Sequence, residues 1–111
     1  MINISNKTKF LIEQFGQEIQ IVDPSQNVVY AKAFIQPLRS DYQSPLYADY
    51  LENQNDEQYL YIGMPGVNLS SYPSGTVIKL GEVTYDIKKV EYVYFSGNVV
   101  YERAVLEESS S

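Results

Sequence analysis

Hydrophobic and polar residues alternate along most of this chain, which is the pattern of β-strands that bury one face. Clusters of Pro, Gly, Asn, Asp and Ser separate the alternating segments and mark turns. The pattern predicts an all-β fold, a small β-barrel or sandwich of about six strands. The alternating segments are residues 18–23, 28–37, 58–64, 75–80, 83–94 and 99–106.

A short stretch near the start follows helical spacing instead. Leu11 and Phe15 lie four residues apart, and Gly16 can take the left-handed conformation that ends many helices. We expect a short N-terminal helix over residues 5–16 whose Leu11 and Phe15 face covers the sheet as a lid. The alternative is that Phe10 and Phe15 dock the helix onto another subunit.

The long strand of residues 83–94 changes phase in its middle. Its apolar residues stand at odd positions up to Ile87 and at even positions from Val90. Because neighbouring residues of a strand face opposite sides, we expect a bulge or sharp bend at Lys88 and Lys89, which lets a strand close a barrel or serve two sheets. The pattern assigns no inward face to residues 99–106.

Other segments make simpler predictions. Residues 28–37 carry apolar side chains in both phases, so we expect a central strand covered at least in part on both faces. Gly81 predicts a two-residue hairpin turn with Gly at its first central position. In residues 58–64, Tyr59 and Tyr61 share one phase and the aliphatic residues take the other.

Residues 38–57 lose this periodicity. A connection of this length inside a compact domain is typically functional or disordered, and we expect a functional loop. The alternatives are a tolerated insertion and a brief helical turn at residues 48–52. The residues predicted to contact a neighbouring ring or a channel are Arg39, Asp41, Tyr42, Tyr47, Asp49, Tyr50 and Glu52.

The length of 111 residues suits one domain, with the strands over residues 17–107 and a frayed tail at 108–111. Eleven Tyr accompany four Phe and no Trp. Tyr suits surfaces where the ring is covered and the hydroxyl stays wet, and sugar-stacking sites usually use Trp. We therefore predict both core and subunit-contact roles for Tyr59, Tyr61, Tyr92 and Tyr94.

Charge and missing residue types argue against several classes of function. A formal net charge of -6 is the wrong sign for neutralising nucleic-acid phosphates. The absence of His and Cys removes common nucleophiles, bases and metal ligands, so we expect no enzyme, no catalytic residues, no metal and no cofactor. No apolar run is long enough to span a bilayer and no export signal is evident, so we expect a soluble, unexported protein without membrane contact.

The charged clusters have simple interpretations. Acids such as Asp49 and Glu52 lack the spacing of a calcium loop, so we interpret them as solvated charge. The pairs Asp23 with Asp41 and Glu102 with Glu107 do not by themselves predict a glycosidase. Lys88 and Lys89, with Arg103, are predicted to pair across strands with Asp86, Glu91 or Glu102, or to form a subunit contact.

Two parts of the chain resemble the head-to-tail joining, or head-closure, proteins of tailed bacteriophages and prophages. In residues 10–21 a short helix ends in Phe-Gly and leads directly into a strand, as in those small neck proteins. Thr76 stands where the family commonly has an acid, and residues 38–74 carry no match. The matching positions of the second part are Gly75, Thr76, Val77, Ile78, Gly81, Tyr85, Asp86, Ile87, Gly97, Tyr101, Ala104, Val105 and Leu106.

The resemblance implies a barrel or sandwich with one small helix, which assembles as a homo-oligomeric ring between the portal-adaptor and the tail. Its partners would be other copies of the chain, the portal-adaptor protein and a tail-completion protein. Residues 38–57 would be the inter-strand loop that reaches the channel or docks on a neighbouring ring. DNA would be only passing or retained cargo, without sequence-specific binding, which a negative lumen suits.

The resemblance also implies a location in the virion neck, and in the bacterial cytoplasm during assembly. The sequence leaves two other functions open. One is a phage tail terminator or tail-tube-like subunit, which would also be an acidic ring-forming β protein. The second is a small ligand-binding barrel with a deep pocket lined by Tyr59, Tyr61, Tyr92 or Tyr94.

Overall fold

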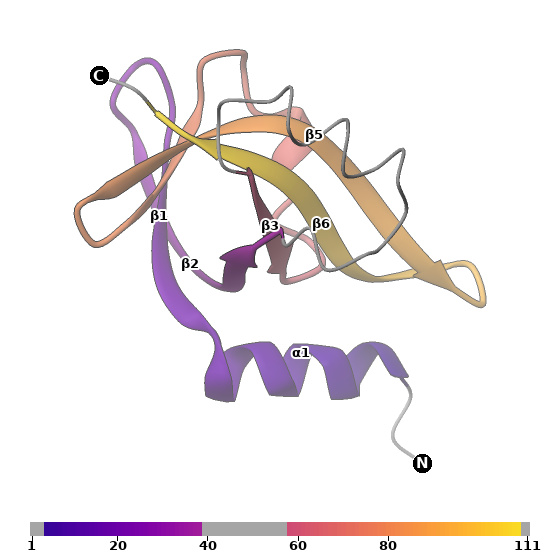
Figure 1. The fold of residues 1–111 in the computed structure, drawn as a ribbon. Coiled ribbons are helices and arrows are strands. Elements are labelled where there is room, and N and C mark those ends of the chain that lie inside the picture. Colours follow the sequence, from indigo (N-terminus) through magenta and orange to yellow (C-terminus); the bar gives the residue numbers. More distant parts are fainter. Residues whose placement is uncertain (1–3, 39–57, 110–111) are drawn as a thin grey trace, which may run out of the picture.

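A computed structural model describes residues 4–38 and 58–109, and shows six strands closed into an antiparallel barrel with one helix beside it (Figure 1). The predicted all-β barrel with a short N-terminal helix is confirmed. Around the barrel the strands follow the order β1-β2-β3-β6-β5-β4. The elements are α1 (Ile4–Phe15), β1 (Gln17–Val22), β2 (Val28–Pro37), β3 (Gln58–Gly63), the 3₁₀ turn η1 (Leu69–Ser71), β4 (Val77–Leu80), β5 (Val83–Phe95) and β6 (Asn98–Glu108).

The predicted bulge in the long strand is confirmed and helps the barrel to close. Ile87 faces Leu106 and Lys89 faces Val105, so Lys88 is an extra residue on β5 without a partner opposite. Before the bulge, β5 pairs with β4 on one side, and along most of its length it pairs with β6 on the other. A bulge bends its strand and increases the local twist, which suits this change of neighbours.

Each of the two tight hairpin turns contains a glycine with positive φ. The β4–β5 turn has two residues, and Gly81 at its first central position has φ of 60°, as predicted. The β5–β6 turn places Ser96 at φ 51° and Gly97 at φ 81°, the positive values that a type I′ hairpin turn requires at both central positions. This turn ends a long hairpin arm, which projects from the barrel in Figure 1.

Gly16 ends the helix for a reason other than the predicted one. It is not among the described residues with positive φ. Instead, a Cβ built on Gly16 would lie 2.5 Å from the Ile12 carbonyl oxygen and 3.2 Å from the Ala33 nitrogen. The residue must therefore be small, because the end of α1 and the backbone of β2 meet there.

The face of α1 that covers the barrel also differs from the prediction. The helix packs against β6 and β2, and Ile12 is its buried residue. The predicted face is exposed, with Phe15 at 68% and Leu11 at 43% of their accessible surface, and Phe10 is exposed as well. The helix is thus a lid, but through Ile12, and its aromatic side chains face outward.

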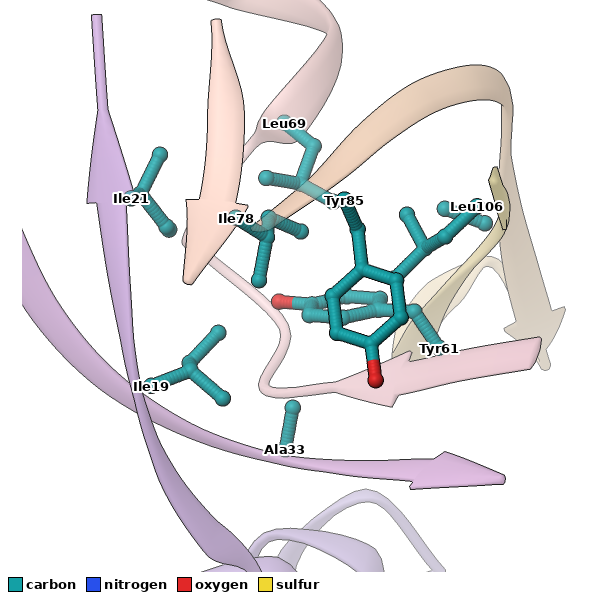
Figure 2. Packing of buried hydrophobic residues seen from close by; sticks show 9 residues of the cluster. Ile19, Ile21, Ala33, Tyr61, Leu69, Ile78, Tyr85 and Leu106 are labelled. Atoms are coloured by element: carbon teal, nitrogen blue, oxygen red, sulfur yellow. The ribbon is translucent and has the colours of Figure 1, made fainter. Parts of the chain in front are cut away.

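The core fills the barrel interior (Figure 2). The ring of Tyr61 extends into the interior among aliphatic side chains, and Tyr85 lies beside it. On β6, the residues in phase with Leu106 point inward, which assigns the face that the sequence left open. On β2 the Ala33 phase faces the core, whereas Val28 and Tyr30 are exposed, so the expected covering of both faces was wrong for the first half of this strand. The core cluster is Ile19, Ile21, Ala33, Tyr61, Leu69, Ile78, Tyr85, Ala104 and Leu106.

Candidate functional site

The predicted loop contacts lie outside the described residues. The structure describes the chain up to Leu38, whose N–H donates to the Gln58 carbonyl oxygen at 2.9 Å, and resumes at Gln58. The two ends of the long connection are therefore adjacent at the β2–β3 pairing. The residues that remain predictions for this reason are Arg39, Asp41, Tyr42, Tyr47, Asp49, Tyr50 and Glu52.

Two of the four tyrosines for which core and contact roles were predicted, Tyr59 and Tyr61, lie in or against the core. Tyr61 is fully buried, so the prediction that it contacts another subunit was wrong. Tyr59 is half-buried and packs on the core, with its ring edge-on to that of Tyr85 at a centroid distance of 5.0 Å. The phase of β3 places the tyrosines inward because Gly63, in the same phase, leaves room for the large ring of Tyr61.

The other two tyrosines lie on the hairpin arm, in different environments. The Tyr92 hydroxyl donates to Asn68 Oδ1 at 2.6 Å and accepts from the Ser70 backbone N–H at 3.2 Å. It also contacts Ser70 Oγ. Tyr92 therefore fastens the arm to the segment that holds η1, whereas Tyr94 is 62% exposed near the tip and has surface available for a partner.

Lys88 and Lys89 form ion pairs within the chain. Lys88 Nζ lies 3.4 Å from Glu107 Oε2, and Lys89 Nζ lies 3.1 Å from Glu91 Oε1. Arg103 Nε lies 3.9 Å from the other oxygen of Glu91. Exposed pairs of this kind contribute less than about 1 kcal/mol each. The cross-strand pairing of Arg103 with Glu91 was predicted, whereas Lys89 pairs with Glu91 within β5 and the pairing of Lys88 with Glu107 was not predicted. The predicted partner contact of the two lysines stays a prediction.

The pattern of the sequence missed a buried carboxylate at the centre of β6. Glu102 is 1% exposed and accepts the backbone N–H of Asn68 at 2.6 Å and that of Leu69 at 3.1 Å, one on each oxygen. These amides begin η1, where no earlier carbonyl can pair with them. Glu102 thus holds the connection between β3 and β4 against the barrel. The sequence could have predicted this burial, because Glu102 has the same strand phase as Ala104 and Leu106.

The position of Glu102 also bears on the acidic pairs considered from the sequence. Glu102 points inward, whereas Glu107, five residues later on β6, faces outward and pairs with Lys88. Side chains on opposite faces of one strand do not converge on a substrate. Asp23 binds Asn27 through both its carboxylate oxygens, and Asp41 lies outside the described residues.

Large apolar side chains are exposed at three places on the described surface. They lie on α1, at the start of β2 and at the tip of the β5–β6 hairpin. Exposed apolar patches often mark interaction sites, so these three groups are candidate contact surfaces. The residues are Phe10, Leu11 and Phe15 on α1, Val28, Val29 and Tyr30 on β2, and Tyr94 and Phe95 at the tip.

A groove of about 570 Å³ lies beside the β2 group, between β2, α1 and the chain that leaves β3. Its lining includes Tyr30, Lys32, Glu13 and Val67. A second hollow of about 310 Å³ lies at the base of the hairpin arm. Neither is the deep barrel pocket that a ligand-binding barrel would need, because Tyr61 and the aliphatic core occupy the described interior.

In residues 4–38 and 58–109, no group of three or more His, Cys, Asp or Glu side chains gathers as a metal site would require. No helix in the same residues has the length and apolar character needed to cross a membrane. Comparisons with protein-family models, with curated proteins and with solved structures find no match. The candidate site is therefore defined by the exposed apolar surfaces and the groove beside β2.

Proposed function

We propose that this protein is a structural subunit of a phage or prophage head–tail connector. In this proposal it closes the head as a ring between the portal-adaptor and the tail, and acts through protein contacts without catalysis. The resemblance of residues 10–21 and 75–106 to neck proteins implies a barrel with one small helix, and the described fold has this composition. A shared architecture alone does not establish a function, so the proposal depends on the exposed apolar surfaces of the domain.

The observation that carries the proposal is the placement of exposed apolar side chains on an otherwise acidic domain. Phe15 on the helix, Tyr30 on β2 and Tyr94 on the arm lie on different elements, and each is more than half exposed. Subunits of a ring need two different contact surfaces for their neighbours, and a further one for the next ring of the stack.

The net charge of -6 fits the same function. A ring of acidic subunits presents a negative lumen, which repels the phosphates of DNA and lets the duplex pass. In this proposal, residues 38–57 face the channel or a neighbouring ring, and DNA is only passing or retained cargo, without sequence-specific binding. During assembly the protein would be in the bacterial cytoplasm, and afterwards in the virion neck.

The test is direct. Purified protein is mixed with the portal–adaptor complex encoded in the same gene cluster, and separately with tail tubes, and both mixtures are imaged by electron microscopy. We expect an added ring on the adaptor side of the portal complex. Rings that cap tubes, or tubes built from this chain, would instead support the tail terminator or tail-tube alternative. Binding to neither assembly would contradict both proposals.

A further inference from the structure

One part of β2 has a neighbouring strand on only one side in the described part of the chain. β2 pairs with β1 from Val28 to Ala33, but with β3 only from Ala33 to Pro37. The edge of residues 28–32 on the β3 side therefore faces no described strand. Unpaired backbone groups on such an edge can pair with a strand from another molecule.

The direction of the backbone groups follows from two hydrogen bonds. The Ile35 N–H donates toward β1, to a side-chain oxygen at its start, at 3.0 Å. The Leu38 N–H donates toward β3, to a main-chain oxygen, at 2.9 Å. Because the direction alternates along a strand, the even-numbered residues of β2, including Tyr30 and Lys32, aim their N–H and C=O groups at the β3 side. The backbone N–H and C=O groups of Tyr30 and Lys32 therefore lie on the side of β2 that lines the groove.

The groove has the form of a slot for an extended segment. After Gly63 the chain turns away from β2, so residues 64–67 form the wall opposite Tyr30 and Lys32. The end of α1 closes one side, where Lys32 Nζ donates to the Glu13 carbonyl oxygen at 3.0 Å. That bond fixes the charged end of Lys32 at the helix terminus. Apart from Lys32 and the acids Glu13 and Glu18, the lining residues are uncharged.

The tip of the β5–β6 hairpin has the matching properties. Residues 92–101 contain no charged side chain, in a chain of which 20% is charged. Tyr94 and Phe95 expose 62% and 55% of their surfaces, and their backbone is already extended. In Figure 1 this tip and the first half of β2 lie at opposite ends of the molecule. Tyr94 shares the second hollow with Gly66, which also lines the groove, but the lining of the groove includes no residue of the tip, so the groove is open to a second copy.

We propose that the edge of β2 and its groove receive the hairpin tip of a second copy of this chain. The tip supplies extended backbone for the β2 edge and aromatic side chains for the apolar slot. Its lack of charge matters because two chains of net charge -6 repel each other, and the groove itself contains Glu13 and Glu18. An uncharged tip approaches these acids without a like-charge contact.

The geometry also determines how such contacts continue. Since the tip and the groove are different surfaces, a contact made in one direction between two copies leaves one groove and one tip unused. Such a head-to-tail contact closes into a ring or continues as a filament. The inference rests on the proposed function insofar as it supplies the contact between neighbouring subunits of that ring, but it is tested on the isolated protein.

The experiment uses disulfide cross-linking, because the natural chain contains no Cys. Tyr30→Cys and Phe95→Cys are made singly and together, at two exposed positions where the substitutions spare the core. Under mild oxidation we expect the double variant to form a ladder of dimers, trimers and larger species. A mixture of the two single variants should stop at dimers. Tyr30→Cys combined with Glu82→Cys, on the exposed β4–β5 turn, is the matched control and should remain monomeric.

Several results would overturn the inference. Cross-linking of Tyr30→Cys with itself would show that two β2 edges pair with each other. A protein that stays monomeric by light scattering at high concentration, or that forms oligomers without the Tyr30–Phe95 cross-link, would also refute it. In the last case the head–tail connector proposal survives with a different contact. If the double variant forms the cross-linked ladder but the protein fails to join the portal complex, the contact between copies holds and the head–tail connector proposal is refuted.

A charge placed on the edge gives a second measurement. Tyr30→Lys adds one positive charge to an edge strand, a device by which proteins prevent strand pairing. We expect the association constant to fall by about tenfold or more, because the charge loses water in the contact without a designed partner. Glu82→Gln changes the net charge by the same amount on the exposed β4–β5 turn and should leave association unchanged. Equal effects of the two substitutions would refute the contact.

Discussion

Substituting Glu102 by Gln tests whether one buried carboxylate holds the β3–β4 connection to the barrel. Glu102 accepts two backbone N–H groups, from Asn68 and Leu69, one on each oxygen. Gln has nearly the same shape but only one acceptor oxygen, so its amide group would face one of the two N–H groups donor to donor. The change is therefore one of hydrogen bonding rather than volume.

The expected cost can be assembled from its parts. A hydrogen bond to a charged group contributes about 1.5–3 kcal/mol, and a buried donor left without a partner costs about 1–3 kcal/mol. Gln recovers part of this because a neutral side chain costs less to bury than a carboxylate. We therefore expect the free energy of unfolding to fall by about 2–4 kcal/mol.

Urea denaturation at neutral pH measures this change, with Glu107→Gln as the control. Glu107 lies on the same strand and pairs with Lys88 near the surface, so its substitution should cost less than about 1 kcal/mol. Amide hydrogen exchange gives an independent measurement, since the N–H groups of Asn68 and Leu69 should lose protection while those of the barrel strands keep theirs. Equal losses of stability for the two variants, or unchanged exchange at both amides, would refute the reasoning.

Two further predictions concern the core and the helix end. Tyr61→Phe removes a buried hydroxyl that has no hydrogen-bond partner in the described chain, and should raise the free energy of unfolding by about 0.5–1 kcal/mol in thermal or urea unfolding. Burial, and next the charge of Glu102, raise the pKa of Tyr61 above its ordinary value of 10.0, so wild-type stability should fall as the pH rises above 10.0, where the unfolded chain loses the phenolic proton first. The Phe variant should lose stability less steeply there, and parallel pH profiles would contradict this. Gly16→Ala should cost about 1–3 kcal/mol, because the new Cβ meets the Ile12 carbonyl oxygen, and a loss below about 0.5 kcal/mol would mean that the helix end moves aside.

The strands were predictable because their periodicity is regular and their turns carry specific residues. Residues 28–37 were predicted with the bounds that the structure shows, and the phase change at Lys88 identified the bulge. Both signals are local. A bulge shifts every later side chain to the other face, so its trace persists over several residues on each side.

The errors arose where the inward face depends on distant parts of the chain. The second half of the helix has apolar residues at positions 10, 11, 12 and 15, and of these the packing on β6 and β2 buries Ile12. Tyr61 points inward because Gly63 provides the space for its ring. Glu102 follows the phase of its apolar neighbours, but a carboxylate is seldom expected in a core unless its hydrogen-bond partners are known. Those partners, at Asn68 and Leu69, lie more than thirty positions away.

The pairing of β6 with β3 ends at Glu102, opposite Tyr92, so the arm beyond these two residues can change independently of the barrel. Residues added in opposing pairs near Ser96 would lengthen the arm by about 3.4 Å per pair while every register inside the barrel stayed as it is. In the ring proposed above, the length of this one arm would then set the spacing between neighbouring subunits without altering the barrel.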